Sequence, residues 1–278
     1  MSFKNFVPEF WAEKIEHELE RKCVFAEDCN REYEGEIKDA GDTVNILGVG
    51  SPTVKELSRK EANGIIDEAE EVEDTNVKLV VDQVRYYNYL VGDIDKAQAQ
   101  GNILAALNKE TSEKLANSID KYIGGFAVDT AVKQMFETPE IVTVNNALDI
   151  IDRTAEKLYE NDVSDSTEIV LTIDPKFFTL FKQAYLKLDT NNHELMKNGK
   201  VAQYGNITVK RSNNIYRAGG ASYLPMRTKR AIAFAQAITK NEAYRPERRF
   251  ADAIKGLAVF GAKIVRPKEI FTLNVKYN

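Results

Sequence analysis

The sequence contains only two cysteines and two histidines among its 278 residues. These are Cys23, Cys29, His17 and His193. Such a set is too small for a disulfide framework or a multi-metal centre, and it fits a reducing cytosol. The six-residue steps from His17 to Cys23 and from Cys23 to Cys29 match no zinc-ligand spacing. Catalysis by Cys23 with the distant His193 has no local nucleophile signature, and inert buried thiols are the commoner case.

Long hydrophobic runs are also absent. The longest, residues 256–262, is far shorter than the ~20 residues that a bilayer crossing needs. Charged residues recur from Lys4 to Glu20, which leaves no apolar stretch long enough for a signal peptide. We therefore expect no membrane span and no secretion.

Motifs for catalysis or cofactor binding are missing as well. In the run Gly256-x4-Gly261-Ala262-Lys263 the lysine stands one position too late for a phosphate loop, and the intervening residues form the apolar body of a strand. Asp93 and Asp95 could hold a metal, but carboxylates directly before a long helix more simply stabilise its positive end. The sequence has no GxSxG, HExxH or GxGxxG pattern. We predict no catalytic residue, no cofactor and no metal site.

The charges that are present are distributed unevenly along the chain. Residues 1–199 hold 22 basic and 39 acidic side chains, whereas residues 200–278 hold 16 basic and 4 acidic ones. This separation would let one part of a molecule attract the opposite part of a neighbour, and it offers a basic surface to a polyanion such as nucleic acid. The alternative is that the two parts neutralise each other within one subunit.

An amphipathic helix is predicted at residues 8–22. Pro8 stands at its start, and Trp11, Ile15 and Leu19 follow at helical spacing. Because a helix this short is marginal alone in water, we expect its Trp11 and Ile15 stripe to dock on the same subunit or on another one.

A long two-stranded arm is predicted within residues 33–90. Residues 43–47 alternate between apolar and polar side chains, and residues 77–88 alternate on the way back. Between them lies an acidic tip, because six of the eight residues 67–74 are carboxylates. An isolated hairpin is at best marginally stable, so we expect the arm to lie against another surface.

The rest of the chain is predicted to mix helices and strands. A helix over residues 93–123 would be about 46 Å long at ~1.5 Å per residue. The further predicted elements are a helix at 145–159, a strand at 168–173, a helix at 174–185, strands at 207–210 and 231–238, a basic loop at 244–249, and a closing pair of strands within 256–275 that turns at Arg266-Pro267.

Several stretches, taken with this order of elements, carry a resemblance. They are FVPEFW at 6–11, NREYEGEI at 30–37, GDTV at 41–44, VGDIDKAQ at 91–98 and GLAVFGAKIVRP at 256–267. The chain resembles the major capsid (coat) proteins of tailed bacteriophages, which have the HK97-like fold, and it looks most like the branch found in phages and prophages of Gram-positive bacteria.

The resemblance implies an α+β fold with five parts. They are an N-terminal arm at 1–32, an extended β-hairpin loop (E-loop) with adjoining strands at 33–90, a peripheral (P) domain with a long spine helix at 91–136, an inserted axial (A) domain at 137–250, and the closing strands of the peripheral domain at 251–278.

The resemblance also implies a function. Members of the family assemble into hexamers and pentamers of an icosahedral shell that encloses double-stranded DNA, so we expect the chain in the virion capsid after assembly in the bacterial host cytoplasm. Some relatives carry a cleaved N-terminal scaffolding segment. Here the arm starts within ten residues of Met1, which favours a separate scaffolding protein, together with a portal. A protein nanocompartment shell of the encapsulin type is the alternative, and a soluble enzyme is a weaker one.

Two hypotheses on contacts follow from the charge distribution. We expect the acidic tip to reach basic residues of an adjacent subunit; the candidates are Glu68, Glu70, Glu71 and Glu73 on one side and Arg245, Arg248 and Arg249 on the other. We also consider non-specific DNA contacts from Lys200, Lys210, Arg211, Lys229 and Arg230. For the second set, contacts between subunits or with solvent are the preferred interpretation.

Overall fold

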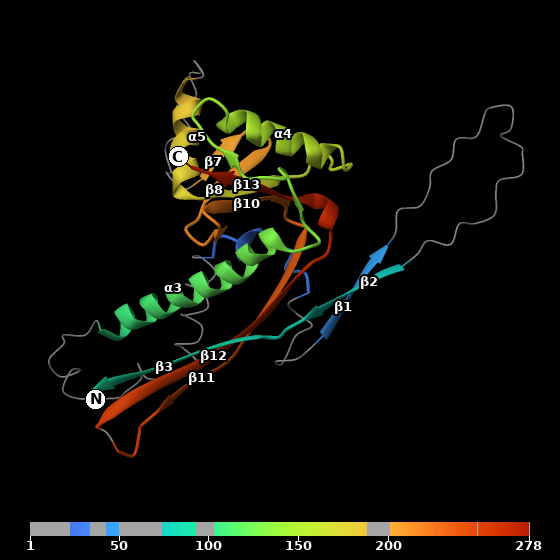
Figure 1. The fold of residues 1–278 in the computed structure, drawn as a ribbon. Helices are drawn as coiled ribbons and strands as arrows, with labels where there is room; N and C mark the ends of the chain where they lie inside the picture. Colours follow the sequence, from blue (N-terminus) through green and yellow to red (C-terminus); the bar gives the residue numbers. More distant parts are fainter. Residues whose placement is uncertain are drawn as a thin grey trace, which may run out of the picture.

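A computed structural model describes residues 23–33, 43–49, 74–92, 103–187, 201–248 and 250–277. The predicted helix at 8–22 and the acidic tip lie outside these residues. The described elements form an upper unit with a large sheet, and a lower unit with a long helix above a narrow sheet (Figure 1).

The upper unit is an eight-stranded sheet accompanied by two helices. Its strand order is β4-β13-β10-β6-β8-β7, with β5 paired to β13 and β9 to β10. The strands are β4 (Lys133–Gln134), β5 (Glu140–Ile141), β6 (Ile169–Ile173), β7 (Val201–Tyr204), β8 (Ile207–Arg211), β9 (Tyr216–Ala218), β10 (Ala221–Thr228) and β13 (Ile270–Lys276). The helices α4 (Ala147–Tyr159) and α5 (Pro175–Lys187) bury one apolar face each in the main core.

The lower unit combines α3 (Ile103–Gly124) with a three-stranded sheet, whose order is β11-β12-β3. The strands are β11 (Ile232–Tyr244), β12 (Ala251–Ile264) and β3 (Gln83–Gly92). Phe234 and Phe260 face α3 and join the main core, and Tyr122 of the helix packs edge-on against Phe260. The predicted long helix is confirmed from Ile103 onward, while residues 93–102 lie outside the described part.

The arm is shorter than the sequence pattern predicts. β1 (Thr43–Val49) pairs with β2 (Asp74–Val80), but the chain then turns, and β3 pairs with β12 instead of continuing the hairpin. The prediction of one returning limb over 77–88 is therefore wrong. The reason is that Leu79 and Val81 are buried against Ala235 and its neighbours. This packing anchors the base of the hairpin on the lower sheet.

The predicted closing pair of strands also needs correction. β12 and β13 are both strands, but they belong to different sheets and do not pair with each other. The short 3-10 helix η5 (Pro267–Glu269) carries the chain from the lower sheet to the upper one. β13 then runs between β10 and the short strands β4 and β5, where six of its seven residues are buried.

Candidate assembly surface

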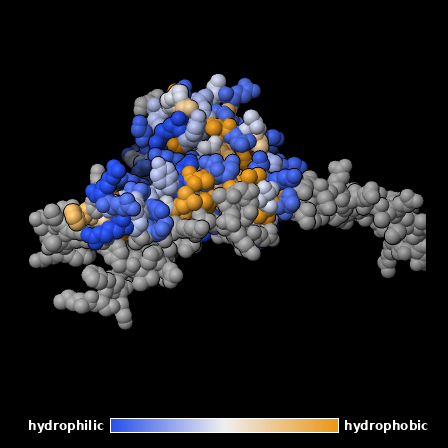
Figure 2. Space-filling model, turned by 90° about the horizontal axis from the view of Figure 1, so that it is seen from below, coloured by the Kyte–Doolittle hydropathy of each residue, from blue (hydrophilic) through white to orange (hydrophobic). Residues whose placement is uncertain are grey.

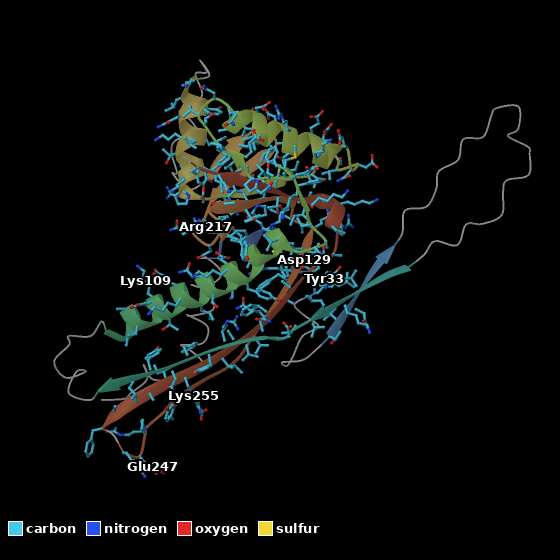
Figure 3. All side chains as sticks on the ribbon, in the orientation of Figure 1. Tyr33, Lys109, Asp129, Arg217, Glu247 and Lys255 are labelled. Carbon is cyan, nitrogen blue, oxygen red and sulfur yellow. The ribbon has the colours of Figure 1, made fainter. Side chains whose placement is uncertain are left out.

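The basic loop predicted at 244–249 lies at the far end of the β11–β12 hairpin. Arg245 and Arg248 are both exposed there, and Figure 3 shows Glu247 at this tip and Lys255 farther up the hairpin. Of the other predicted contact residues, Trp11, Ile15 and Arg249 lie outside the described part of the chain, as do Glu68, Glu70, Glu71 and Glu73. The structure therefore places two of the nine candidates and leaves their pairing with the acidic tip a prediction.

The same tip carries an exposed aromatic residue. Phe250 is 89% exposed, and it lines a shallow hollow with Arg245, Pro246, Glu247 and Arg248. A phenylalanine this exposed does not stabilise the isolated subunit by burial, because its apolar surface stays in water. Its position directly after the basic loop is a sequence signal, but Phe250 was not among the predicted contact residues.

A second exposed apolar row runs along β3. Val84 is 44% exposed, Tyr86 81% and Leu90 43%, and these alternate with residues that face α3, such as Arg85. Arg85 donates to Ser118 of α3 at 3.1 Å and lies over the ring of Phe260. Among the described residues, the helix therefore covers one side of the strand, and the other side is left exposed. This row was not predicted from the sequence, because the same alternation fits a limb of the arm.

Polar contacts tie the uncovered side of the sheet together across three strands. Lys255 of β12 donates to Glu242 of β11 at 2.8 Å, and its ammonium lies 5.2 Å from the ring centre of Tyr244. Tyr244 and Asn88 of β3 form a hydrogen bond at 3.2 Å. The hydrogen bond with Glu242 raises the pKa of Lys255, so this lysine stays charged at neutral pH.

The segment 23–33 is fixed to the body by buried polar contacts. The Asp120 carboxylate of α3 accepts the backbone N–H groups of Val24 and Phe25, both at 2.9 Å. Burial raises the pKa of Asp120, while these N–H donors oppose the shift. The buried Arg227 guanidinium donates to the carbonyls of Phe25 and Asp28. Because the backbone N–H and carbonyl groups of Phe25 are both bound and its ring is buried, Phe25 is held in place in the body of the subunit.

Some of the DNA-contact candidates are engaged inside the subunit. Lys210 donates to Asp28 at 2.8 Å and to Glu27 at 2.9 Å, with only 13% of its side chain exposed. Burial alone would lower its pKa, but these hydrogen bonds raise it. Lys210 therefore forms an ion pair within its own subunit, and a contact between Lys210 and DNA stays a prediction.

Further basic side chains from the same part of the sequence have partners in their own subunit. Lys229 binds Glu168 at 2.8 Å, and Arg211 lies over the ring of Phe178. Arg230 is exposed, whereas Lys200 lies outside the described residues. The charge separation along the chain is thus partly neutralised within one subunit, as the simpler of the two interpretations predicts.

Within the described ranges, no three His, Cys, Asp or Glu side chains come close enough to hold a metal ion. In the same ranges, no helix is both long and apolar enough to span a membrane.

Comparison with known proteins gives matches at the level of structure. No family model matches the chain, and no curated protein matches it. Among solved structures, one of Mycobacterium phage Che8 is 25% identical, with a TM-score of 0.70 over 92% of this chain and 91% of that one. The capsid of cyanophage P-SCSP1u is 13% identical, with a TM-score of 0.68 over 92% and 88%. A virus-like particle from Pyrococcus furiosus is 12% identical, with a TM-score of 0.61 over 95% and 98%.

Proposed function

Because the chain has the fold of tailed-phage major capsid proteins, we propose that it is the major capsid protein of a tailed phage or prophage. In this role it would assemble into hexamers and pentamers of an icosahedral shell around double-stranded DNA. The observation that carries the proposal is a match over about nine-tenths of both chains to a phage structure at 25% identity.

The surfaces of the subunit support this proposal. A shell subunit needs contacts that it does not complete by itself, and specific interfaces bury about 800 Å² on each partner. The exposed row of Val84, Tyr86 and Leu90 and the exposed Phe250 are such incomplete surfaces. In this interpretation the upper unit is the axial domain, the lower unit is the peripheral domain and residues 43–80 belong to the E-loop. Because β13 is part of the eight-stranded sheet of the upper unit, it would then belong to the axial domain and not to the peripheral domain.

A protein nanocompartment is the second candidate function. It is favoured by the similarity to the Pyrococcus particle, which covers 98% of that chain. The two functions differ in their contents, because a capsid holds DNA and a nanocompartment holds protein cargo. Nuclease-protected DNA in particles from induced cells, with portal and terminase genes beside this gene, would favour the capsid.

Electron microscopy of the purified, overexpressed chain tests both shell functions at once. We expect closed shells, or rings of five and six subunits. A monodisperse monomer at all concentrations and salt conditions, with or without a co-expressed scaffolding protein, would contradict the proposal.

We further propose that the acidic tip contacts the basic hairpin end of a neighbour. Changing Arg245, Arg248 and Arg249 together to glutamate should lower the yield of shells, because like charges would then face each other at every copy of the contact. Changing the four tip glutamates to lysine in the same chain should restore it. The measurement is the assembled fraction by sedimentation.

The control for this prediction reverses exposed charges elsewhere. Arg153→Glu with Lys157→Glu on α4 alters side chains that are about half exposed and make only local pairs. Shell yield that is equal in the arginine variant and the control would contradict the proposed pairing.

A separate scaffolding protein, a portal and packaged DNA complete the proposed partners. Two of the described DNA-contact candidates remain. Arg211 lies over the ring of Phe178, and Arg230 is exposed. Contacts with DNA through these residues would be sequence-independent and would weaken with salt.

A further inference from the structure

A group of polar side chains is buried where the segment 23–33 meets the upper sheet, although hydrophobic side chains remain on the surface seen in Figure 2. The group consists of Asp28, Thr172 and Arg227, and each of these residues is at most 1% exposed. Their neighbour Lys210 binds the Oδ1 atom of Asp28 at 2.8 Å. Burial of such groups is unfavourable unless their donors and acceptors are bound.

The pairing of the strands places three of these side chains on one face of the upper sheet. β6 runs between β8 and β10. Arg227 of β10 pairs with Val170 of β6, and Lys210 of β8 pairs with Thr172 of β6. Because Val170 and Thr172 are two residues apart on the same strand, the side chains of Arg227, Thr172 and Lys210 all point to the same face.

Asp28 lies over β6 on this face. Its carboxylate is bound by Lys210 of β8, and its carbonyl accepts a hydrogen bond from Nη1 of Arg227 on β10. The strands that carry these two basic residues lie on either side of β6, and neighbouring strands are about 4.8 Å apart. Asp28 therefore spans the strand on which Thr172 stands.

Three polar atoms in this group form no hydrogen bond with the described part of the chain. They are Oδ2 of Asp28, Nε of Arg227 and Oγ1 of Thr172, and all three are shielded from bulk solvent. The Nε atom of arginine can only donate, a carboxylate oxygen can only accept, and a hydroxyl group can do both. An occupant that binds all three atoms must therefore both accept and donate hydrogen bonds.

The charges around these atoms favour a neutral occupant. Arg227 and Lys210 carry two positive charges, and Asp28 and Glu27 carry two negative ones, with Glu27 bound to Lys210 at 2.9 Å. A cation would meet the N–H donor of Arg227, and an anion would meet the carboxylate of Asp28. Water is neutral, accepts and donates, and when buried it makes about three hydrogen bonds to groups that otherwise have no partner.

We propose that Asp28, Thr172 and Arg227 bind one structural water molecule. The water accepts the N–H of Arg227 Nε, donates to Asp28 Oδ2 and shares a hydrogen bond with the hydroxyl of Thr172. The segment that holds Asp28 is also bound to the lower sheet, because Asn30 donates to the carbonyl of Ile232 at 2.9 Å. The water site therefore lies at the junction of the two units, and it belongs to the single subunit, whether or not the subunit assembles.

Thr172→Val tests the proposal, because valine has nearly the shape of threonine but no hydroxyl group. If Thr172 binds water, we expect the ratio of folded to unfolded subunit to fall about fivefold in urea unfolding, as for the loss of an ordinary hydrogen bond. A buried hydroxyl group without any partner is itself unfavourable, so its removal would raise this ratio. A rise or an unchanged ratio would therefore overturn the proposal.

The matched control is Thr154→Val on α4. Thr154 is also fully buried, and its hydroxyl donates to the carbonyl of Ile150 at 2.7 Å. This variant shows how much stability is lost when a bound threonine hydroxyl is removed, and the Thr172 variant should show a loss of similar size.

A second pair of variants covers the case in which valine disturbs the packing. Thr172→Ser and Thr172→Ala both remove the methyl group, and only serine keeps the hydroxyl. We expect the ratio of folded to unfolded subunit to be about fivefold higher for the serine variant. Equal ratios for the two variants would contradict a water bound at this hydroxyl.

An experimental structure at a resolution that shows ordered water tests the site directly. We expect density for one water within about 3.2 Å of both Arg227 Nε and Asp28 Oδ2. A direct hydrogen bond between these two atoms, or no density beside them, would show that the proposal is wrong. Neither measurement needs assembled shells, so the failure of this proposal and the failure of the proposed function are distinguishable.

Discussion

Replacing Arg227 with methionine is expected to lower the free energy of unfolding of the unassembled subunit by about 2–4 kcal/mol, because two buried carbonyls lose a charged donor. The guanidinium is fully buried and donates to the carbonyls of Phe25 and Asp28, and it lies 6.0 Å from the ring centre of Phe25. Methionine fills much of the same space but donates no hydrogen bond, so both carbonyls would remain buried without these donors. Urea unfolding followed by circular dichroism measures the change.

The local consequence is a looser N-terminal segment. Cys23 and Cys29 are buried beside Phe25, and burial raises the pKa of Cys29 to about 11, so neither thiol should react readily in the intact subunit. In the Arg227 variant both should react faster with a thiol reagent. Arg227→Lys keeps the charge but cannot span two carbonyls, and it should show a smaller loss.

The control is Arg153→Met on α4, where a half-exposed arginine pairs with Asp149. An exposed pair of this kind contributes less than about 1 kcal/mol, so the variant should unfold almost like the original chain. Equal stability of the Arg227 and Arg153 variants would show that the buried arginine does not fix the segment.

Elements with a local cause could be predicted from the sequence. The helix predicted at 145–159 is observed at Ala147–Tyr159, and the one predicted at 174–185 at Pro175–Lys187. The second begins where it does because Asp174 accepts the N–H of Phe177 at 2.8 Å, a contact between residues three apart. Such signals are contained in a few consecutive residues.

Pairings between distant strands could not be predicted in the same way. The alternation from Val77 to Asn88 fits a hairpin limb and an edge strand equally well, because both have a period of two. What separates β2 from β3 is the change of partner from β1 to β12, which involves residues far away in the sequence. Arg227 likewise counts only as one more basic residue in the sequence, although it binds a carbonyl 199 positions earlier.

For the candidate site, the sequence predicted the loop but not the apolar surface. Pro246 and the run of charges indicated an exposed turn, and Arg245 and Arg248 do lie there. The exposure of Tyr86 depends on which side of β3 meets α3, and no local pattern decides this. The contacts of the acidic tip and of Trp11 stay predictions, since those residues lie outside the described part of the chain.

Replacing Gly261 with alanine should detach the base of the arm from the body. A Cβ atom at this position would fall on the carbonyl of Val80 and 2.9 Å from the Cα of Val81, so backbone atoms, not flexible side-chain ends, would have to move. Val81 and Leu79 anchor the arm on the lower sheet, and displacing them would open their small apolar cluster. We expect a loss of about 1–3 kcal/mol in the free energy of unfolding, and more for Gly261→Val.

We expect this substitution to reduce assembly more than stability. The base of the arm is not part of the main core, so the core can stay intact, whereas the proposed contacts need the arm to be oriented toward a neighbouring subunit. The measurements are urea unfolding of the subunit and the assembled fraction by sedimentation. Gly125→Ala is the matched control, since nothing lies within 4 Å of a Cβ at that position. If the Gly261→Ala variant assembles as well as the Gly125→Ala variant, the close contact between the base of the arm and β12 does not orient the arm for assembly.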